Sequence, residues 1–190
     1  SRRQRQMCIR DRYCFISYIC MFVEALNFNP MFDLLNKYPN NGSFEFKSTD
    51  SLSNVCNAPK NKSGVYIVYA VKGHTKYLIY IGCSGLEDNG EIKLRKGGMC
   101  GRLVNGKQFE KARKHSWSNK VIEKSLDNLV IEWWDTEDDF PEIVEFCLIL
   151  EYILVNKRLS EWNTILSLKE SLRSQCENFI QDNNIQALMN

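Results

Sequence analysis

Two neighbouring apolar segments constrain the fold of this chain more than any other feature. Residues 64–71 are G-V-Y-I-V-Y-A-V, residues 77–82 are Y-L-I-Y-I-G, and a polar stretch containing Gly73 separates them. β-Branched and aromatic residues favour strands, and a short polar segment with Gly favours a hairpin turn. Apolar residues occupy successive positions in both segments, which predicts a hairpin within a sheet that is covered on both faces.

One more strand and several helices complete the predicted fold. Residues 129–136 (L-V-I-E-W-W-D-T) predict a third strand, and Pro141 suits the first position of a helix that runs to about residue 156. The Asn-, Ser-, Lys- and Pro-rich residues 37–63 and the Gly-rich residues 83–98 are expected to be loops. Further helices are expected at 99–104, 116–124 and 164–180. We therefore predict an α+β fold, a small three-stranded antiparallel sheet flanked by helices.

The first twenty residues obscure the charge of the chain. Residues 2–12 resemble the translation of a transposon-based sequencing adapter, so we expect residues 1–20 to be a non-native leader, with Met21 or Met31 as the natural start. A basic arm that binds nucleic acid is the alternative interpretation. The formal net charge is +2 overall, but five Arg and one Asp give the leader +4, so residues 21–190 carry −2.

The rest of the chain divides into three expected parts. Residues 21–62 form an N-terminal extension, residues 62–165 the main domain, and residues 166–190 a C-terminal helix that packs on it. Five cysteines lie outside the leader, none in a C-x-x-C pair, which argues against a zinc site and a secreted disulfide framework. No apolar run approaches the roughly 20 residues of a membrane-spanning helix. We expect a cytoplasmic protein without a membrane partner.

Tyr66 and Tyr80 are the first candidate site residues. A hairpin centred on Gly73 would place them opposite each other on one face, with their Cβ atoms about 5 Å apart. On its own, such a pair is more simply explained by aromatic packing, and it becomes a candidate site only through the residues described next.

Arg102 and Glu151 are charged candidates that lie on predicted helices. Arg102 follows a Gly-rich approach, and its planar fork suits phosphate oxygens, although a surface arginine is the simpler interpretation. Glu151 lies in an apolar stretch; helical geometry places Glu142 about 180° and Glu145 about 120° from it, so Glu151 points inward if those two face water. A buried carboxylate needs a metal ion or a paired cation, and pairing with a core arginine is the alternative.

Charge is segregated along the chain. Residues 93–114 contain one acid and eight bases, whereas residues 132–151 contain eight acids and no base. The bases are Lys93, Arg95, Lys96, Arg102, Lys107, Lys111, Arg113 and Lys114. Basic side chains around a phosphate-binding arginine are what contact with a DNA backbone requires, and a solvated loop is the alternative. Trp117 nearby is expected in the core, with base stacking as the alternative.

In combination, these residues resemble the GIY-YIG nuclease superfamily. Gly64-Val65-Tyr66 matches the first motif, Tyr80-Ile81-Gly82 the second, and Arg102, Glu151 and Asn163 the arginine, glutamate and asparagine that follow. The resemblance covers residues 62–165, and the stretch 93–108 looks most like the restriction-endonuclease-like branch. It implies a metal-dependent endonuclease that acts on DNA, and it allows a homodimer.

The resemblance also implies roles for the matched residues. Glu151 would hold Mg²⁺ or Mn²⁺, Arg102 would bind the scissile phosphate, and Tyr66 or Tyr80 would help to activate water. Asn163 would support the site, unless it only caps a helix. Lys93, Lys96, Lys107, Lys111, Arg113 and Lys114 would bind the nucleic acid.

The sequence departs from the family pattern in the part that transfers protons. Many relatives carry His or Tyr one turn after the arginine, where this chain has Asn105 and Gly106, so Lys93 or His115 is a possible substitute. Cys83 stands where many relatives have Lys or Thr. A catalytically silent nucleic-acid-binding or interaction module is therefore the alternative function, and a domain without a nucleic-acid role is a third.

Overall fold

The computed structural model describes residues 32–183 and 185, so the predicted leader lies outside the described residues. In chain order the elements are η2 Asp33–Lys37, β1 Asn41–Phe46, α2 Leu52–Val55, β2 Gly64–Lys72, β3 Thr75–Ser84, β4 Leu86–Asp88, β5 Glu91–Lys93, α3 Gly98–Asn105, β6 Lys107–Gln108, β7 Lys111–Ala112, α4 Arg113–Glu123, β8 Asn128–Asp135, α5 Pro141–Asn156, η3 Glu170–Leu172 and α6 Arg173–Asp182. None of the helices in the described part of the chain is long and apolar enough to cross a membrane.

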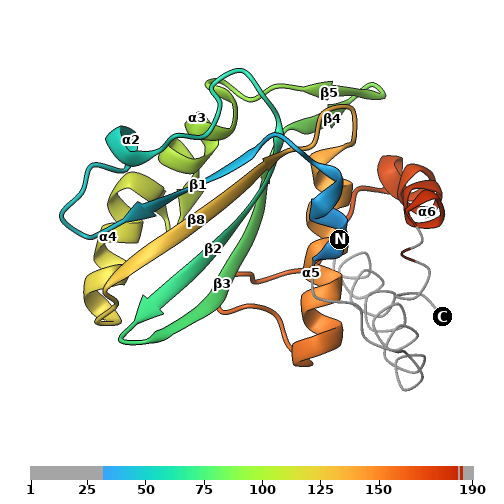
Figure 1. The fold of residues 1–190 in the computed structure, drawn as a ribbon. Coiled ribbons are helices and arrows are strands. Elements are labelled where there is room, and N and C mark those ends of the chain that lie inside the picture. Colours follow the sequence, from blue (N-terminus) through green and yellow to red (C-terminus); the bar gives the residue numbers. More distant parts are fainter. Residues whose placement is uncertain (1–31, 184, 186–190) are drawn as a thin grey trace, which may run out of the picture.

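The main sheet has four antiparallel strands in the order β1-β8-β2-β3 (Figure 1). The fold is therefore α+β as predicted, but the prediction of three strands was wrong. The missed strand, β1, lies in the segment whose polar composition suggested a loop. Phe44 and Phe46 stand two positions apart in it and are both buried, and this period of two is the strand signal in the sequence.

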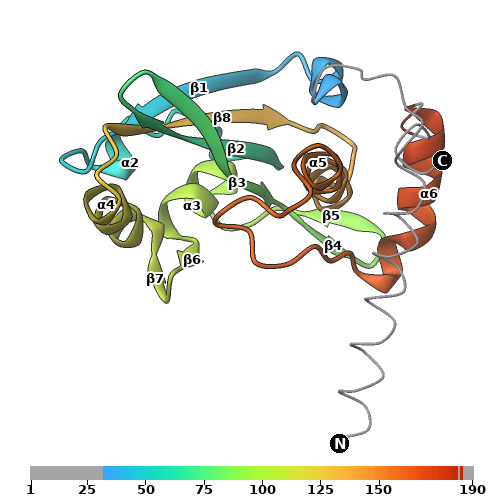
Figure 2. The same cartoon turned by 90° about the horizontal axis from the view of Figure 1, so that it is seen from below.

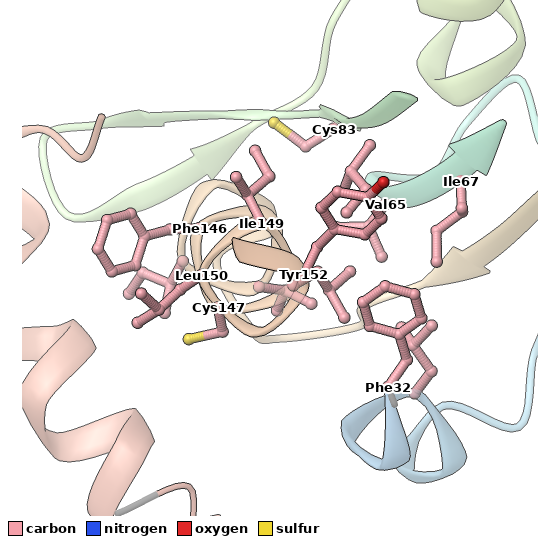
Figure 3. Close-up of a cluster of buried hydrophobic side chains, with 14 of the residues drawn as sticks. Phe32, Val65, Ile67, Cys83, Phe146, Cys147, Ile149, Leu150 and Tyr152 are labelled. Atoms are coloured by element: carbon pink, nitrogen blue, oxygen red, sulfur yellow. The ribbon is translucent and has the colours of Figure 1, made fainter. Parts of the chain in front are cut away.

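Helices cover both faces of the sheet, as the apolar hairpin predicts. The face that carries Tyr66 and Val68 packs against α2, α3 and α4, and the opposite face packs against α5 (Figures 1 and 2). Helix α5 is itself enclosed, because η2 and α6 pack on its outer side. Figure 3 shows Val65, Ile67 and Cys83 on the strand side of α5 and Phe32 on another side.

The helix predictions succeed where an end signal is strong. Helix α5 begins at Pro141 and ends at Asn156, as expected. The last helix was expected from residue 164 but begins only at Arg173, and Ile165 is exposed rather than part of a helical apolar face. The segment between α5 and η3 is irregular, with a turn at residues 161–162, and it passes the free edge of β3, where the Trp162 N–H donates to the Ile79 carbonyl.

Candidate functional site

A bulge in β3 brings Tyr66 and Tyr80 onto the same face of the sheet. Val68 pairs with Tyr80 and Tyr69 pairs with Leu78, so Ile79 is an extra residue in β3. Tyr66 therefore faces Gly82, and the predicted direct pairing with Tyr80 is wrong. Because Val68 is two residues from Tyr66, both tyrosines still lie on one face, with ring centroids 6.1 Å apart.

Gly64 and Gly82, the glycines of the two motifs, lie where any side chain would clash with a neighbouring strand. A Cβ atom on Gly82 would lie 2.7 Å from the Tyr66 hydroxyl oxygen and from Cε2 of the same ring. A Cβ atom on Gly64 would lie 2.0 Å from the Trp134 carbonyl oxygen on the neighbouring strand. The Tyr66 ring thus rests on the bare backbone of Gly82, and this contact sets the position of its hydroxyl.

Arg113 joins the two tyrosines through hydrogen bonds. Its Nη1 donates to the Tyr66 hydroxyl at 2.6 Å and its Nη2 donates to the Tyr80 hydroxyl at 2.9 Å. Nη1 also donates to the Arg102 carbonyl at 3.1 Å, and Nε donates to Oε1 of Gln108 at 3.2 Å. The guanidinium is therefore held on three sides, as its planar fork of donors allows.

Arg113 is not available for the DNA contact that the sequence suggested. Its exposed fraction is 1%, because it is the first residue of α4 and its side chain turns into the core beside Trp117. Burial opposes its charge, but Tyr66, Tyr80 and Glu145 outweigh that effect and raise the Arg113 pKa. A permanent positive charge therefore lies directly behind the two phenol hydroxyls.

Arg102 lies beside this cluster and is half-buried on α3. Its Nε is shielded from solvent and has no hydrogen-bond partner among the described residues. Arg102 forms none of the ion pairs within 4 Å that the described side chains make with one another. Its charge nevertheless favours the ionised forms of Tyr80, Cys83 and Glu145. Arg102 thus lies next to Tyr80 and Glu145, and its guanidinium makes no ion pair with the described side chains.

Glu145 is the carboxylate that the structure brings to this cluster. It projects from the second turn of α5 and accepts a hydrogen bond at 2.9 Å from the Cys83 thiol at the end of β3. Burial raises the Glu145 pKa, whereas Cys83, Arg102 and Arg113 lower it in that order. Burial, followed by the negative Glu145, raises the pKa of the Cys83 thiol, which is therefore a neutral donor.

Glu151 lies elsewhere, so the structure does not join it to the tyrosines. One of its oxygens accepts a hydrogen bond at 2.6 Å from the Phe32 backbone N–H, just before η2. Six residues along a helix turn the side chain by about 240°, so Glu151 and Glu145 point to different sides of α5. Burial raises the Glu151 pKa, and the Phe32 N–H lowers it in part. Glu151 is half-buried, and its described neighbours are Phe32 and Asp33 rather than the tyrosine cluster.

The misplacement follows from the enclosed position of α5. The sequence argument assumed that Glu142 and Glu145 face water, but Glu142 accepts a 2.6 Å hydrogen bond from the Glu87 N–H of β4. A helix that packs on nearly all sides has no single apolar stripe, so periodicity does not reveal which carboxylate faces the sheet edge. One signal for Glu145 remains in the sequence. Glu142 and Glu145 are three positions apart, so both lie on the same face of the helix, near the end that follows β8.

Asn163 binds the exposed edge of β3. Its Oδ1 accepts from the Ile81 N–H at 2.9 Å, and its Nδ2 donates to the Ile81 carbonyl at 2.9 Å. Ser160 also donates to Oδ1. No helix begins at Asn163, so the capping interpretation does not hold. The asparagine instead pairs with the central residue of the second motif as another strand would.

The predicted nucleic-acid-binding lysines lie at the surface around α3 and α4. Lys96, Lys107, Lys111 and Lys114 are exposed, and Lys107 and Lys111 belong to the short β6–β7 hairpin. Lys93 is exposed but pairs with Asp88 at 2.6 Å. His115 is also exposed. Trp117 is fully buried and donates to Gln108, as the packing interpretation predicts.

The cluster offers one carboxylate, that of Glu145, as a donor to a metal ion. The described residues contain no group of three or more His, Cys, Asp or Glu side chains placed to hold a metal. A structural zinc ion needs such a closed set, which these residues do not supply. Mg²⁺ and Mn²⁺ are held by one or two carboxylates together with water and phosphate oxygens. Glu145 provides one hard oxygen donor of that type.

Comparison with known proteins leaves the chain without a matching relative. No family profile matches it, and neither a curated protein nor a solved structure matches it.

Proposed function

We propose that this protein is a metal-dependent endonuclease of the GIY-YIG type that hydrolyses DNA phosphodiester bonds. The observation that carries the proposal is the convergence of Tyr66, Tyr80, Arg102, Arg113 and Glu145 at the free edge of β3. These residues come from two strands and three helices that are distant in the sequence. Four of them match residue types, in the right order, that the sequence resemblance assigns to catalysis.

The charges of the cluster suit an anionic substrate. Two guanidinium groups, Arg102 and Arg113, stand against the single carboxylate of Glu145, and neither arginine forms an ion pair within 4 Å with another described side chain. In a partly desolvated site such an excess positive charge is strongly felt. A phosphodiester that enters beside Arg102 would neutralise it, and the unsatisfied donors of Arg102 match phosphate oxygens.

Each residue then has a distinct task. Arg102 binds the scissile phosphate and stabilises the charge that develops on its oxygens. Glu145, in place of the expected Glu151, would hold Mg²⁺ or Mn²⁺, and such an ion would stabilise the charge on the leaving oxygen. Asn163 holds the edge of β3 beside the site through its two hydrogen bonds with Ile81.

Tyr80, which is half-buried, orients the attacking water, whereas the fully buried Tyr66 is held in place behind it by Arg113. Burial raises the Tyr80 pKa far above its usual value near 10, and Arg113 and Arg102 offset that rise only in part. Tyr80 is therefore protonated at neutral pH and serves as a hydrogen-bond donor. Since Arg113 donates to both phenol oxygens, each phenol proton is free to point away from Arg113.

DNA would reach the site across Lys96 just before α3 and the lysines on the β6–β7 hairpin and α4. Lys96, Lys107, Lys111 and Lys114 are exposed around Arg102, and phosphate contacts of this kind supply sequence-independent affinity. The alternative function is a nucleic-acid-binding module without catalysis. The presence of Arg102 and Glu145 in one cluster favours the enzyme, because binding alone does not need a half-buried carboxylate next to the phosphate site.

A plasmid nicking assay on the full chain tests the proposal. We expect nicking with Mg²⁺ or Mn²⁺ and none with EDTA, and we expect R102A and E145Q to lose activity while E151Q retains it. Cleavage that is equal in wild type, R102A and E145Q would overturn the proposed mechanism. DNA binding without nicking under all conditions would establish the silent module instead.

A further inference from the structure

We infer that Arg113 is a positioning residue, which holds the Tyr66 and Tyr80 hydroxyls together in the geometry that the reaction needs. The inference rests on the proposed function and assigns to that site a residue that the sequence placed on the DNA-binding surface. Its basis is one buried guanidinium whose donors reach both phenol oxygens, at 2.6 and 2.9 Å.

The surroundings of Arg113 are built to keep it in place. Its Nε donates to Gln108 Oε1, and the same oxygen accepts a 2.9 Å hydrogen bond from Trp117 Nε1. The carbonyl of Arg102 accepts a third hydrogen bond from the guanidinium. The Tyr66, Tyr80 and Trp117 rings lie 5.1–5.4 Å from the guanidinium carbon. Such a network costs rotamer freedom and desolvation, and it holds the position of the cation closely.

The space that Arg113 occupies is left open by a glycine. Gly106 stands one turn after Arg102, and a Cβ atom there would lie 3.2 Å from Nη1 of Arg113. Position 106, which lies close to Arg113, therefore contributes no side chain to the space beside the tyrosines. Arg113 enters the gap from the start of α4 and supplies a positive charge where a titratable side chain is missing.

This arrangement assigns different tasks to the two arginines. Arg102 is half-buried and would bind the substrate phosphate, whereas Arg113 is 1% exposed and acts only through the tyrosines. Removal of the guanidinium fork should therefore slow catalysis without weakening DNA binding. A lysine at 113 keeps the charge but offers no planar fork that reaches both hydroxyls.

The test compares R113K with R158K, a matched substitution of an exposed arginine beyond the end of α5. We expect R113K to lower kcat by roughly 10–100-fold while KM stays within about threefold, as expected for misplaced catalytic groups. R158K should match wild type in both constants. An R113K protein with unchanged kcat overturns the inference, and so does one whose KM rises while kcat is unchanged, because Arg113 would then contact DNA.

Two measurements without DNA separate this inference from the proposed function. Nitrogen-15 NMR should show slowly exchanging Nη protons of Arg113 that change in Y66F and Y80F, and the falls in Tm caused by R113K and Y66F should be non-additive. Additive falls in Tm and unchanged Nη signals would overturn the inference that Arg113 positions the two tyrosine hydroxyls. A wild-type protein that nicks no DNA would instead overturn the proposed function, and with it the catalytic role of Arg113.

Discussion

The ring of Tyr66 lies directly over Gly82 on the neighbouring strand. A Cβ atom at position 82 would be 2.7 Å from the Tyr66 hydroxyl oxygen and 2.8 Å from Cζ, closer than real contacts of this kind. The last residue of the second sequence motif therefore makes room for the last residue of the first. This contact links two short patterns that the sequence shows only as separate segments.

The first prediction concerns this contact. G82A should destabilise the protein by about 1–3 kcal/mol, because the fully buried Tyr66 ring cannot shift without disturbing Arg113. Nicking should fall further than stability alone explains, since the hydroxyl moves. Urea unfolding and the plasmid assay measure the two effects.

G73N provides the control for G82A. Gly73 lies in the hairpin turn with φ +59° and nothing within 4 Å of a Cβ atom, and asparagine tolerates this left-handed conformation. We expect G73N to be close to wild type in both measurements. A G82A protein as stable and active as G73N would show that the Tyr66 ring does not need a glycine at position 82.

The second prediction separates the two carboxylates of α5. E145Q should reduce Mg²⁺-dependent nicking by at least about 100-fold, because it removes the proposed ligand. E151Q should keep activity, since the glutamine oxygen still accepts the hydrogen bond from the Phe32 N–H. Loss of nicking in E151Q with retention in E145Q would restore the original assignment from the sequence.

The third prediction follows from the raised pKa of Glu145. Burial raises this pKa above its ordinary value of 4.5, so the folded protein holds the proton more tightly than the unfolded chain. Stability contributed by this group is therefore lost as the pH rises from 4.5 through the folded-state pKa. E145Q lacks this loss and should be at least as stable as wild type at neutral pH, with the advantage gone below pH 4.5. Thermal unfolding across this pH range is the measurement, and an E145Q protein that is less stable at neutral pH would contradict it.

The sequence was sufficient for the elements whose signals are local. The apolar hairpin, the Pro141 start of α5 and the third strand all appear where residue types and spacing put them. Strand β1 was missed because its polar neighbours dominated the composition, although Phe44 and Phe46 carried the alternation. The β3 bulge could not be predicted, because one extra residue within an apolar strand does not change the hydrophobic pattern.

For the candidate site, the sequence predicts the residue types and their order along the chain, but not which residues meet in space. Tyr66, Tyr80 and Arg102 follow from motifs, and the structure brings them together. Glu145 and Arg113 required tertiary information, because α5 is enclosed on several sides and because nothing local distinguishes Arg113 from Lys111 or Lys114. Their roles depend on which side of an element faces the β3 edge.

The fourth prediction concerns Asn163. N163A leaves the Ile81 N–H and carbonyl at the β3 edge without partners, which should cost about 1–3 kcal/mol. N119A, an exposed position on α4, is the matched control and should be neutral or slightly stabilising because alanine favours helices. Urea unfolding of both variants provides the comparison. Equal stabilities would mean that the Asn163 amide contributes nothing to the sheet edge.

The fifth prediction concerns the DNA-binding surface. Substituting the exposed Lys107, Lys111 and Lys114 by alanine should weaken DNA binding and reduce the slope of log K against log salt concentration by up to about 3, because each phosphate contact contributes roughly 0.9. The exposed Lys47, Lys72 and Lys157, changed together, remove the same charge from other elements and should leave the slope nearly unchanged. Fluorescence anisotropy with a short labelled duplex at several salt concentrations gives both slopes. If the two triple variants have equal slopes, DNA does not lie along α3, α4 and the β6–β7 hairpin, and its approach to Arg102 must be sought from the α5 side.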